Sequence, residues 1–289
     1  MTEIRKKKWG GYEELVYGVL TYAMLILLTL FVLVPFYVIV ITSFREQYDA
    51  MFNGFRWWPS EFLWDGYASI FEKSLYNISI PRAFLVTCYT VIPTVLIGLF
   101  MSSLAAFAFA KVKFRGNSVA FSVLLFTMMI PGTITMVPQS LMYASFGWFG
   151  TFAPIMVPGM FGSATCVFFM RQFIKGIPND LIEAAQIDGL NIFKIFLYII
   201  LPLCAPALIS QGLLWFIAGY NDYLTPLIYI SDIEMFPLQL ALAQFRGKFA
   251  ADIPSLMASS VVTMLPLLVI YLAMQKFFIK GIAVSGLKG

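Results

Sequence analysis

Long apolar stretches dominate this chain and are separated by short polar segments. Runs without a charged residue extend over residues 15–43, 83–110, 117–170, 195–221 and 253–275. A helix needs roughly 20 residues to span a bilayer, so each run is long enough to cross once and the third is long enough to cross twice. The runs are continuously apolar, whereas barrel strands alternate in polarity, and this favours helices.

The pattern predicts an all-α membrane protein with six transmembrane helices. We expect them at about residues 15–43, 83–110, 117–143, 151–173, 196–220 and 254–277, with a turn at 145–150 dividing the third run. Residues 1–14 are expected to form a cytoplasmic N-terminal segment, and residues 15–289 the transmembrane domain. Prolines and glycines interrupt the third and fourth spans, as hinges or as static kinks: Pro131, Gly132, Pro138, Pro154, Pro158 and Gly159.

Basic residues predict the orientation, because they are more frequent in cytoplasmic segments. With both termini inside, 13 of the 19 lie inside, namely Arg5, Lys6, Lys7, Lys8, Lys111, Lys113, Arg115, Arg171, Lys175, Lys194, Lys276, Lys280 and Lys288. The remaining 6 lie outside: Arg45, Arg56, Lys73, Arg82, Arg246 and Lys248. We therefore expect an N-in, C-in protein.

The composition agrees with membrane insertion and narrows the function. Hydrophobic residues make up 60% of the chain and charged residues 12%, against about 25% charged in soluble domains. The net charge of +4 is spread over several inner segments and gives no reason to expect nucleic acid. Cys88, Cys166 and Cys204 show no CxxC pairing and are expected to be small buried residues.

Enzymatic and ion-coupled functions lack the residues that they need. The chain has no His, its carboxylates lie outside the apolar runs, and no GxxxxGK[ST] phosphate loop is present. We therefore expect no catalytic site, no metal and no cofactor in this chain. Any energy for transport would come from a separate polypeptide.

One charged, amphipathic segment, residues 174–200, connects the cytoplasmic ends of the fourth and fifth expected spans. Pro178 suits a first helical turn, Gly189 allows a break, and Asn191 can cap a second helix. The segment thus predicts two short helices joined at a glycine on the cytoplasmic side.

The composition of this segment allows two interpretations. Ala184 and Ala185 offer a small-residue face that can fit a groove, and Glu183 is placed to meet a cation. Those properties suit docking to a partner protein. An amphipathic helix pair lying on lipid headgroups would satisfy the same pattern.

A resemblance separates the two interpretations. The stretch IPNDLIEAAQIDGLNIFKIFLYIILPLCAPAL resembles the EAA signature of ABC-importer permease subunits, in the version found in carbohydrate uptake. In that family the loop is the coupling helix, which inserts into a cleft of a cytoplasmic ATPase. The resemblance assigns ATPase coupling to Glu183, Ala184, Ala185, Asp188 and Gly189, with Gly189 forming the turn.

The resemblance continues through the second half of the chain. YNDYLTPLIYI and the last span with its tail, MQKFFIKGIAVSGLKG, are similar to segments of the same family. Asn221 and Asp222 would line the substrate path or touch a binding protein, or else close a helix end by hydrogen bonds. The loop with Gln244, Phe245, Arg246 and Gly247 resembles one that reaches into the binding protein; an ordinary solvated turn is the alternative.

The resemblance implies a type I ABC-importer permease fold and a set of partners. These are a second permease subunit, two copies of an ABC ATPase that hold ATP and Mg, an extracytoplasmic binding protein and a carbohydrate, with oligosaccharides leading. The protein would reside in the cytoplasmic membrane of a bacterium or archaeon. A self-contained sugar channel or secondary carrier is the alternative function, and a membrane scaffold is a second one.

Overall fold

The computed structural model describes the backbone of residues 11–71, 79–248 and 252–286, and the side chains of residues 15–71, 79–243 and 252–275. Every regular element in these ranges is helical, which confirms the predicted all-α class. The chain divides into two compact units, residues 1–69 with 249–261 and residues 70–248 with 262–289.

Four helices in the described ranges are long and apolar enough to cross a membrane. They are Leu15–Thr42 within α1 (Gly11–Thr42), α4 (Ile80–Lys111), the pair α7 (Ala153–Met160) and α8 (Ala164–Lys175), and Ile253–Gln275 within α15 (Ile253–Gly286). Two bent helix pairs raise the number to as many as six. The expected six spans thus correspond to the upper count.

The bent pairs correct two predicted spans, 117–143 and 196–220, which are not continuous helices. α5 (Asn117–Met128) and α6 (Gly132–Ser145) meet at 98°, with Pro131 at the break. The second pair bends by 77° at Cys204, between Pro202 and Pro206. Proline has no N–H to donate and its ring clashes with the preceding turn, so each break lies where the helical ladder is interrupted.

The second of these pairs is irregular before its bend as well. α10 (Ile192–Ile195) continues into a π-helical turn, η1 (Phe196–Ile200), and then into α11 (Leu201–Leu203) and α12 (Ala205–Tyr220). The predicted fifth span therefore begins inside a helix that already starts at Ile192.

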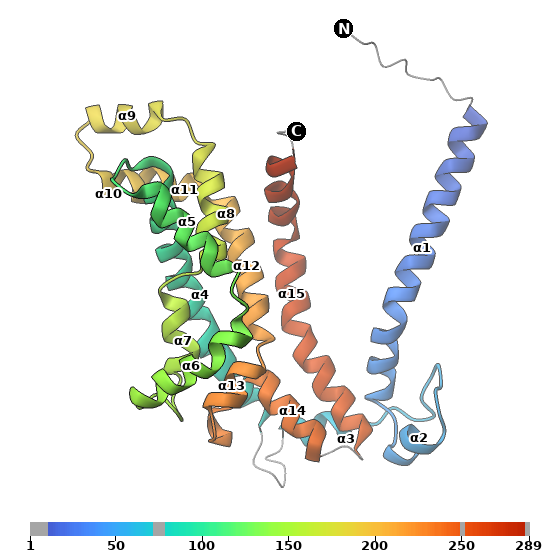
Figure 1. Cartoon of the computed structure of the whole chain (residues 1–289). Helices are drawn as coiled ribbons and strands as arrows, with labels where there is room; N and C mark the ends of the chain where they lie inside the picture. Colours follow the sequence, from blue (N-terminus) through green and yellow to red (C-terminus); the bar gives the residue numbers. More distant parts are fainter. Residues whose placement is uncertain (1–10, 72–78, 249–251, 287–289) are drawn as a thin grey trace. The chain divides into compact units, whose positions relative to one another are not determined.

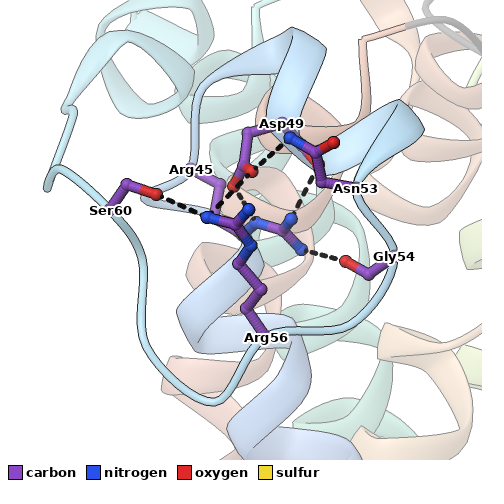
Figure 2. Close-up of polar contacts among 6 residues, drawn as sticks. All are labelled: Arg45, Asp49, Asn53, Gly54, Arg56 and Ser60. Atoms are coloured by element: carbon purple, nitrogen blue, oxygen red, sulfur yellow. Dashed lines mark hydrogen bonds and ion pairs between the residues drawn. The ribbon is translucent and has the colours of Figure 1, made fainter.

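The first unit contains α1, α2 (Gln47–Phe52), most of α3 (Asp65–Phe71) and the first turns of α15. Its loop after α1 is held by a buried ion pair (Figure 2): Arg45 Nε donates to Asp49 Oδ2 at 2.7 Å. Asn53 donates to the other carboxylate oxygen at 2.9 Å, and Arg45 Nη1 donates to the Gly54 carbonyl at 2.8 Å. These bonds, chiefly the one from Arg45, hold the pKa of Asp49 below its usual value.

α4 is the organising helix of the second unit, where it packs against α7, α8, α12 and α14 (Leu238–Lys248). α4 begins near the end that carries α6, α13 (Leu224–Tyr229) and α14, and runs toward the end that carries α9 (Asp180–Ile187) and α10 (Figure 1). The core cluster gathers along this path: Ala106, Phe107, Cys166, Val167, Met170, Ile174, Ile177, Ile182, Ala185, Ile195, Phe196, Ile200, Cys204 and Ala207.

Glycines bring α4 and α7 into backbone contact. A Cβ added at Gly98 would lie 2.5 Å from the Gly159 carbonyl oxygen and 2.6 Å from Cη2 of Trp215. A Cβ at Gly159 would lie 2.5 Å from Cγ2 of Thr94. Small residues permit this close approach between membrane helices, where dispersion contacts rather than water exclusion hold helices together.

Hydroxyl groups on α4 accept hydrogen bonds from backbone N–H groups of neighbouring elements that have no partner within their own helix. Ser102 Oγ accepts from the N–H of Ser163, at the break between α7 and α8, at 3.0 Å. Thr87 Oγ1 accepts from the N–H of Leu238, at the start of α14, at 2.8 Å. Hydrocarbon offers no water to such groups, so neighbouring helices must satisfy them.

We expect Gly98→Ala to destabilise the protein by about 1–3 kcal/mol, because the new methyl group overpacks a contact made partly of backbone. Thermal unfolding of the purified protein measures the effect as a lower Tm. Gly132→Ala is the matched control, since nothing lies within 4 Å of a Cβ at Gly132. Equal Tm values for the two variants would contradict the close contact.

The lowered pKa of Asp49 predicts that the contribution of the Arg45–Asp49 ion pair to stability is lost in acid. A carboxylate whose pKa is depressed in the folded state stabilises the protein above the ordinary pKa of an Asp side chain, and this contribution is lost as the pH falls through the lower folded-state pKa. We expect Asp49→Asn to lower Tm at pH 7, with the difference from wild type narrowing as the pH approaches 3.

The control for this ion pair is Asp65→Asn, which removes an exposed carboxylate from the first turn of α3. It should leave the pH dependence of Tm close to that of wild type. A Tm difference between Asp49→Asn and wild type that stays constant from pH 7 to pH 3 would show that the carboxylate charge does not matter.

Candidate functional site

The predicted pair of short helices is present at one end of the second unit (Figure 1). α9 spans Asp180–Ile187, Gly189 follows with φ of +83°, and α10 begins at Ile192. Two short helices joined at a glycine are therefore confirmed. Pro178 lies two residues before α9 rather than in its first turn, which corrects that detail of the prediction.

The turn at Gly189 is a Schellman motif. The N–H of Leu190 donates to the Ala185 carbonyl at 3.0 Å, and the N–H of Gly189 donates to the Gln186 carbonyl at 3.0 Å. This motif requires a left-handed residue after the helix, which glycine adopts without a Cβ penalty. Asn191 then caps α10 as predicted, its Oδ1 accepting from the N–H of Lys194 at 2.9 Å.

The segment that leads into α9 is tied to the end of α4. Lys111, the last residue of α4, donates from Nζ to the Ile177 carbonyl at 2.5 Å and to Asn179 Oδ1 at 2.7 Å. A cation at a helix C-terminus also interacts favourably with the helix dipole. One side chain therefore joins α4 to the chain immediately before α9.

The underside of α9 is apolar and buried. Ile182 and Ala185 belong to the core cluster, with 8% and 5% of their surface exposed. Ala184, by contrast, is exposed. The small-residue face expected from Ala184 and Ala185 together is therefore divided: Ala185 packs inward, and Ala184 alone is available to a partner.

The outer side of α9 carries charge around apolar side chains. Glu183 and Asp188 are exposed, and neither makes an ion pair or side-chain hydrogen bond with another residue whose side chain is described. On the same segment, Ile187 is 86% exposed and Leu181 is 44% exposed. Exposed large apolar side chains rimmed by polar ones are typical of a protein or membrane interface.

Beside α9 lies a groove of about 930 Å³, formed with residues 109–117. Its lining includes Asn179, Glu183 and Gln186 from the segment of α9, and Lys113 and Arg115 from the segment after α4. In the sequence, both basic residues indicated only the orientation of the chain. Their placement in the same groove as Glu183 is a tertiary feature, because more than 60 residues of chain separate the two segments.

At the opposite end of the unit, the two polar residues after α12 have different surroundings. Asn221 Nδ2 donates to the Ile217 carbonyl at 2.9 Å, and its Oδ1 accepts from Gln239 at 3.2 Å. Asn221 thus closes the helix end. Asp222 accepts from the N–H of Thr225 at 3.1 Å and also lines a cavity of about 310 Å³.

The predicted loop with Gln244, Phe245, Arg246 and Gly247 is helical instead. Its backbone belongs to α14, which extends to Lys248. The four side chains lie outside the described residues. Their expected contact with a binding protein stays a prediction.

The cavity beside Asp222 holds two residues that the sequence did not single out. Trp215 and Thr94 line the cavity beside Asp222. Both stand in apolar runs, where an aromatic or a Thr is ordinarily a packing residue, so the sequence carries no signal for them.

Known proteins similar to this chain were found by sequence and by structure. Residues 84–284 match the family described as "Binding-protein-dependent transport system inner membrane component". The chain is 31% identical over 258 residues to the arabinooligosaccharides transport system permease protein AraQ of Halalkalibacterium halodurans, covering 88% of this chain and 91% of that protein.

A second relative and a solved structure extend the comparison. The chain is 29% identical over 259 residues to the melibiose/raffinose/stachyose import permease protein MelC of Bacillus subtilis, covering 89% of this chain and 91% of that protein. A chain of a bacterial ABC transporter involved in the import of the acidic polysaccharide alginate superposes with a TM-score of 0.81 at 22% identity, covering 93% of this chain and 99% of that one. The two chains share a fold.

We expect Gly189→Ala to loosen the loop, because a left-handed residue with a Cβ costs about 1–2 kcal/mol. Nothing lies within 4 Å of the added Cβ, so strain of the backbone is the whole effect. Trypsin cleavage after the exposed Lys175 and Lys194 should become about 5–30 times faster. Gly189→Asn, which tolerates this conformation better, should be cleaved more slowly than Gly189→Ala; equal rates would contradict the explanation.

Proposed function

Since this chain belongs to the family of binding-protein-dependent transport system inner membrane components, we propose that it is one permease subunit of an ABC importer for a carbohydrate, with oligosaccharides as the leading class. Relatives named for the transport of arabinooligosaccharides and of melibiose, raffinose and stachyose support the cargo. The fold shared with a chain of an alginate ABC transporter is that of a type I importer permease.

The observation that carries the proposal is the contrast between the two sides of α9. Its underside is buried through Ile182 and Ala185, while Glu183 and the 86% exposed Ile187 face away from the core. A carboxylate that its own chain leaves unpaired, next to an uncovered apolar side chain, suits a protein surface better than water. The proposed occupant is a cytoplasmic ABC ATPase.

The proposal includes the other components of the importer. A second permease subunit forms a heterodimer with this chain, and two ATPase copies bind ATP and Mg and hydrolyse the nucleotide. An extracytoplasmic binding protein delivers the carbohydrate. This chain supplies no catalytic group and holds no cofactor in the proposed scheme.

The proposed orientation puts both termini and α9 in the cytoplasm of a bacterium or archaeon. It rests on the 13 basic residues that this arrangement puts inside against 6 outside. The six spans of the proposal comprise the four long apolar helices and the two bent pairs. α13, whose Pro226 lines the cavity beside Asp222, then lies at the end toward the outer side (Figure 1).

The mechanism is alternating access driven by the ATPases. Closure of the two ATPases around ATP would pull on the two coupling loops and tilt the paired permeases from an inward-open to an outward-open state. Because each state has a different affinity for the ATP-bound partner, the free energy of nucleotide binding selects between them. Glu183, Ala184 and Asp188 would contact the ATPase, and Ala185 and Gly189 would position them.

We expect Glu183→Lys to uncouple ATP hydrolysis from transport. The test is the complete complex in liposomes, with ATPase activity measured with and without binding protein. Truncating one partner of a buried interfacial charge pair costs about 2–5 kcal/mol and reversing its charge adds repulsion, so stimulation by the binding protein should fall more than about tenfold. Glu46→Lys is the matched control, since Glu46 is also exposed and makes no side-chain cap bond at α2.

The opposite result would favour the self-contained channel or carrier. Sugar movement by this chain without any ATPase, unaffected at Glu183, would overturn both the docking and the importer proposals. Equal loss of stimulation in Glu183→Lys and Glu46→Lys would point to a general effect of charge rather than to docking.

A further inference from the structure

A cavity of about 310 Å³ lies between α4, α7 and α12, next to α13. Its volume is close to the lower limit of the roughly 300–1,000 Å³ found for small-molecule sites. Like such sites, it has mostly apolar walls with a few polar groups: Thr90, Thr94, Trp215 and Asp222. Exposed Ala218 and half-buried Asp222 stand on its wall.

The polar groups of the cavity are mainly hydrogen-bond acceptors. Thr90 Oγ1 donates its proton to the Val86 carbonyl at 3.0 Å, and Thr94 Oγ1 donates to the Thr90 carbonyl at 2.7 Å. A hydroxyl whose proton is engaged still offers lone pairs. The Asp222 carboxylate can only accept; Oδ1 takes the Thr225 N–H, and no described residue donates to Oδ2.

Trp215 supplies an aromatic wall in a fixed position. Its ring lies against Gly98, where an added Cβ would meet Cη2 at 2.6 Å and Cζ3 at 3.1 Å, and it borders Gly159 on α7. No described residue accepts a hydrogen bond from the indole nitrogen. A flat apolar surface beside several acceptors fits a ring that has C–H faces and hydroxyl donors at its edge.

We propose that this cavity is a saccharide subsite within this subunit, selective for an uncharged sugar ring over a uronate. Asp222 and the two threonine hydroxyls accept from the sugar hydroxyls, and Trp215 contacts a face of the ring. The carboxylate of Asp222 repels an anionic sugar, and the acceptor-rich lining offers few hydrogen-bond donors to the carboxylate of a uronate. The inference rests on the proposed function, because it assumes that a carbohydrate crosses this permease.

The cavity also explains why Asp222 differs from its neighbour. Asn221 uses both of its side-chain groups on Ile217 and Gln239. Asp222 keeps one carboxylate oxygen free of any described donor while bordering the cavity. A carboxylate oxygen that borders a cavity without a described donor is available to a ligand that donates hydrogen bonds.

The test uses the complete transporter in nanodiscs without binding protein, so that only the membrane subunits select the sugar. Ala218→Cys places a thiol on the cavity wall, and its rate of modification by a methanethiosulfonate reagent is measured. The neutral probes are those of arabinotriose, raffinose and lactose that the same complex imports. The anionic probe is trigalacturonate. Ser231→Cys, on an exposed residue outside the cavity, is the labelling control.

We expect an imported neutral sugar to slow the labelling of Ala218→Cys and not of Ser231→Cys, whereas trigalacturonate leaves both rates unchanged. Adding Asp222→Asn should raise the concentration for half-protection about ten- to a hundredfold, since a hydrogen bond to a charged group is lost. Asparagine can still accept from the Thr225 N–H, so the local fold is kept. Asp232→Asn makes the same change at an exposed cap outside the cavity and should leave protection unchanged.

Three results would overturn the inference and leave the proposed function standing. In the first, the complex imports a neutral sugar that does not slow the labelling of Ala218→Cys. In the second, trigalacturonate slows that labelling as much as the neutral sugar does. In the third, the assembled complex shields the thiol from the reagent with or without sugar. Failure of the complex to import any saccharide would remove the proposed function, and the subsite with it.

Discussion

Interrupted helices inside a bilayer depend on a neighbour that replaces their lost backbone hydrogen bonds, and in this protein α4 is that neighbour. Ser102 accepts from the N–H at the break between α7 and α8, and Thr87 accepts from the first N–H of α14. Gly98 lets the α7 backbone approach closely enough for these contacts to persist. Without such acceptors each break would leave a buried N–H unpaired. This would cost free energy, because the hydrocarbon offers no water to accept the hydrogen bond.

The same helix connects the two functional regions of the second unit. Thr90 and Thr94 form part of the cavity, whereas Phe107 belongs to the core cluster beneath α9 and Lys111 binds the segment that leads into α9. The proposed saccharide subsite and the proposed docking element are thus built on one continuous helix. This arrangement suits a subunit whose two regions must change state together.

The sequence predicted the features that local chemistry determines. The apolar runs, the glycine turn and the Asn191 cap each depend on a few neighbouring residues and were predicted correctly. The interruption at Pro131 was predicted but the size of its bend was not, and the bend at Cys204 was not predicted, because a proline can kink a span slightly or break it, and the packing around it decides which. Which of Ala184 and Ala185 faces inward depends likewise on the core beneath α9.

The attachment of α9 also has a mechanical consequence. This helix is held on the bundle by its Schellman turn, by its buried Ile182 and by the bonds from Lys111. A displacement imposed on α9 would have to expose apolar surface or break buried bonds before it could be absorbed locally. It would therefore be transmitted to α4 through the bonds from Lys111 and to the core cluster through Ile182. In the proposed importer, the distance that a bound partner moves α9 would then set how far the membrane helices move.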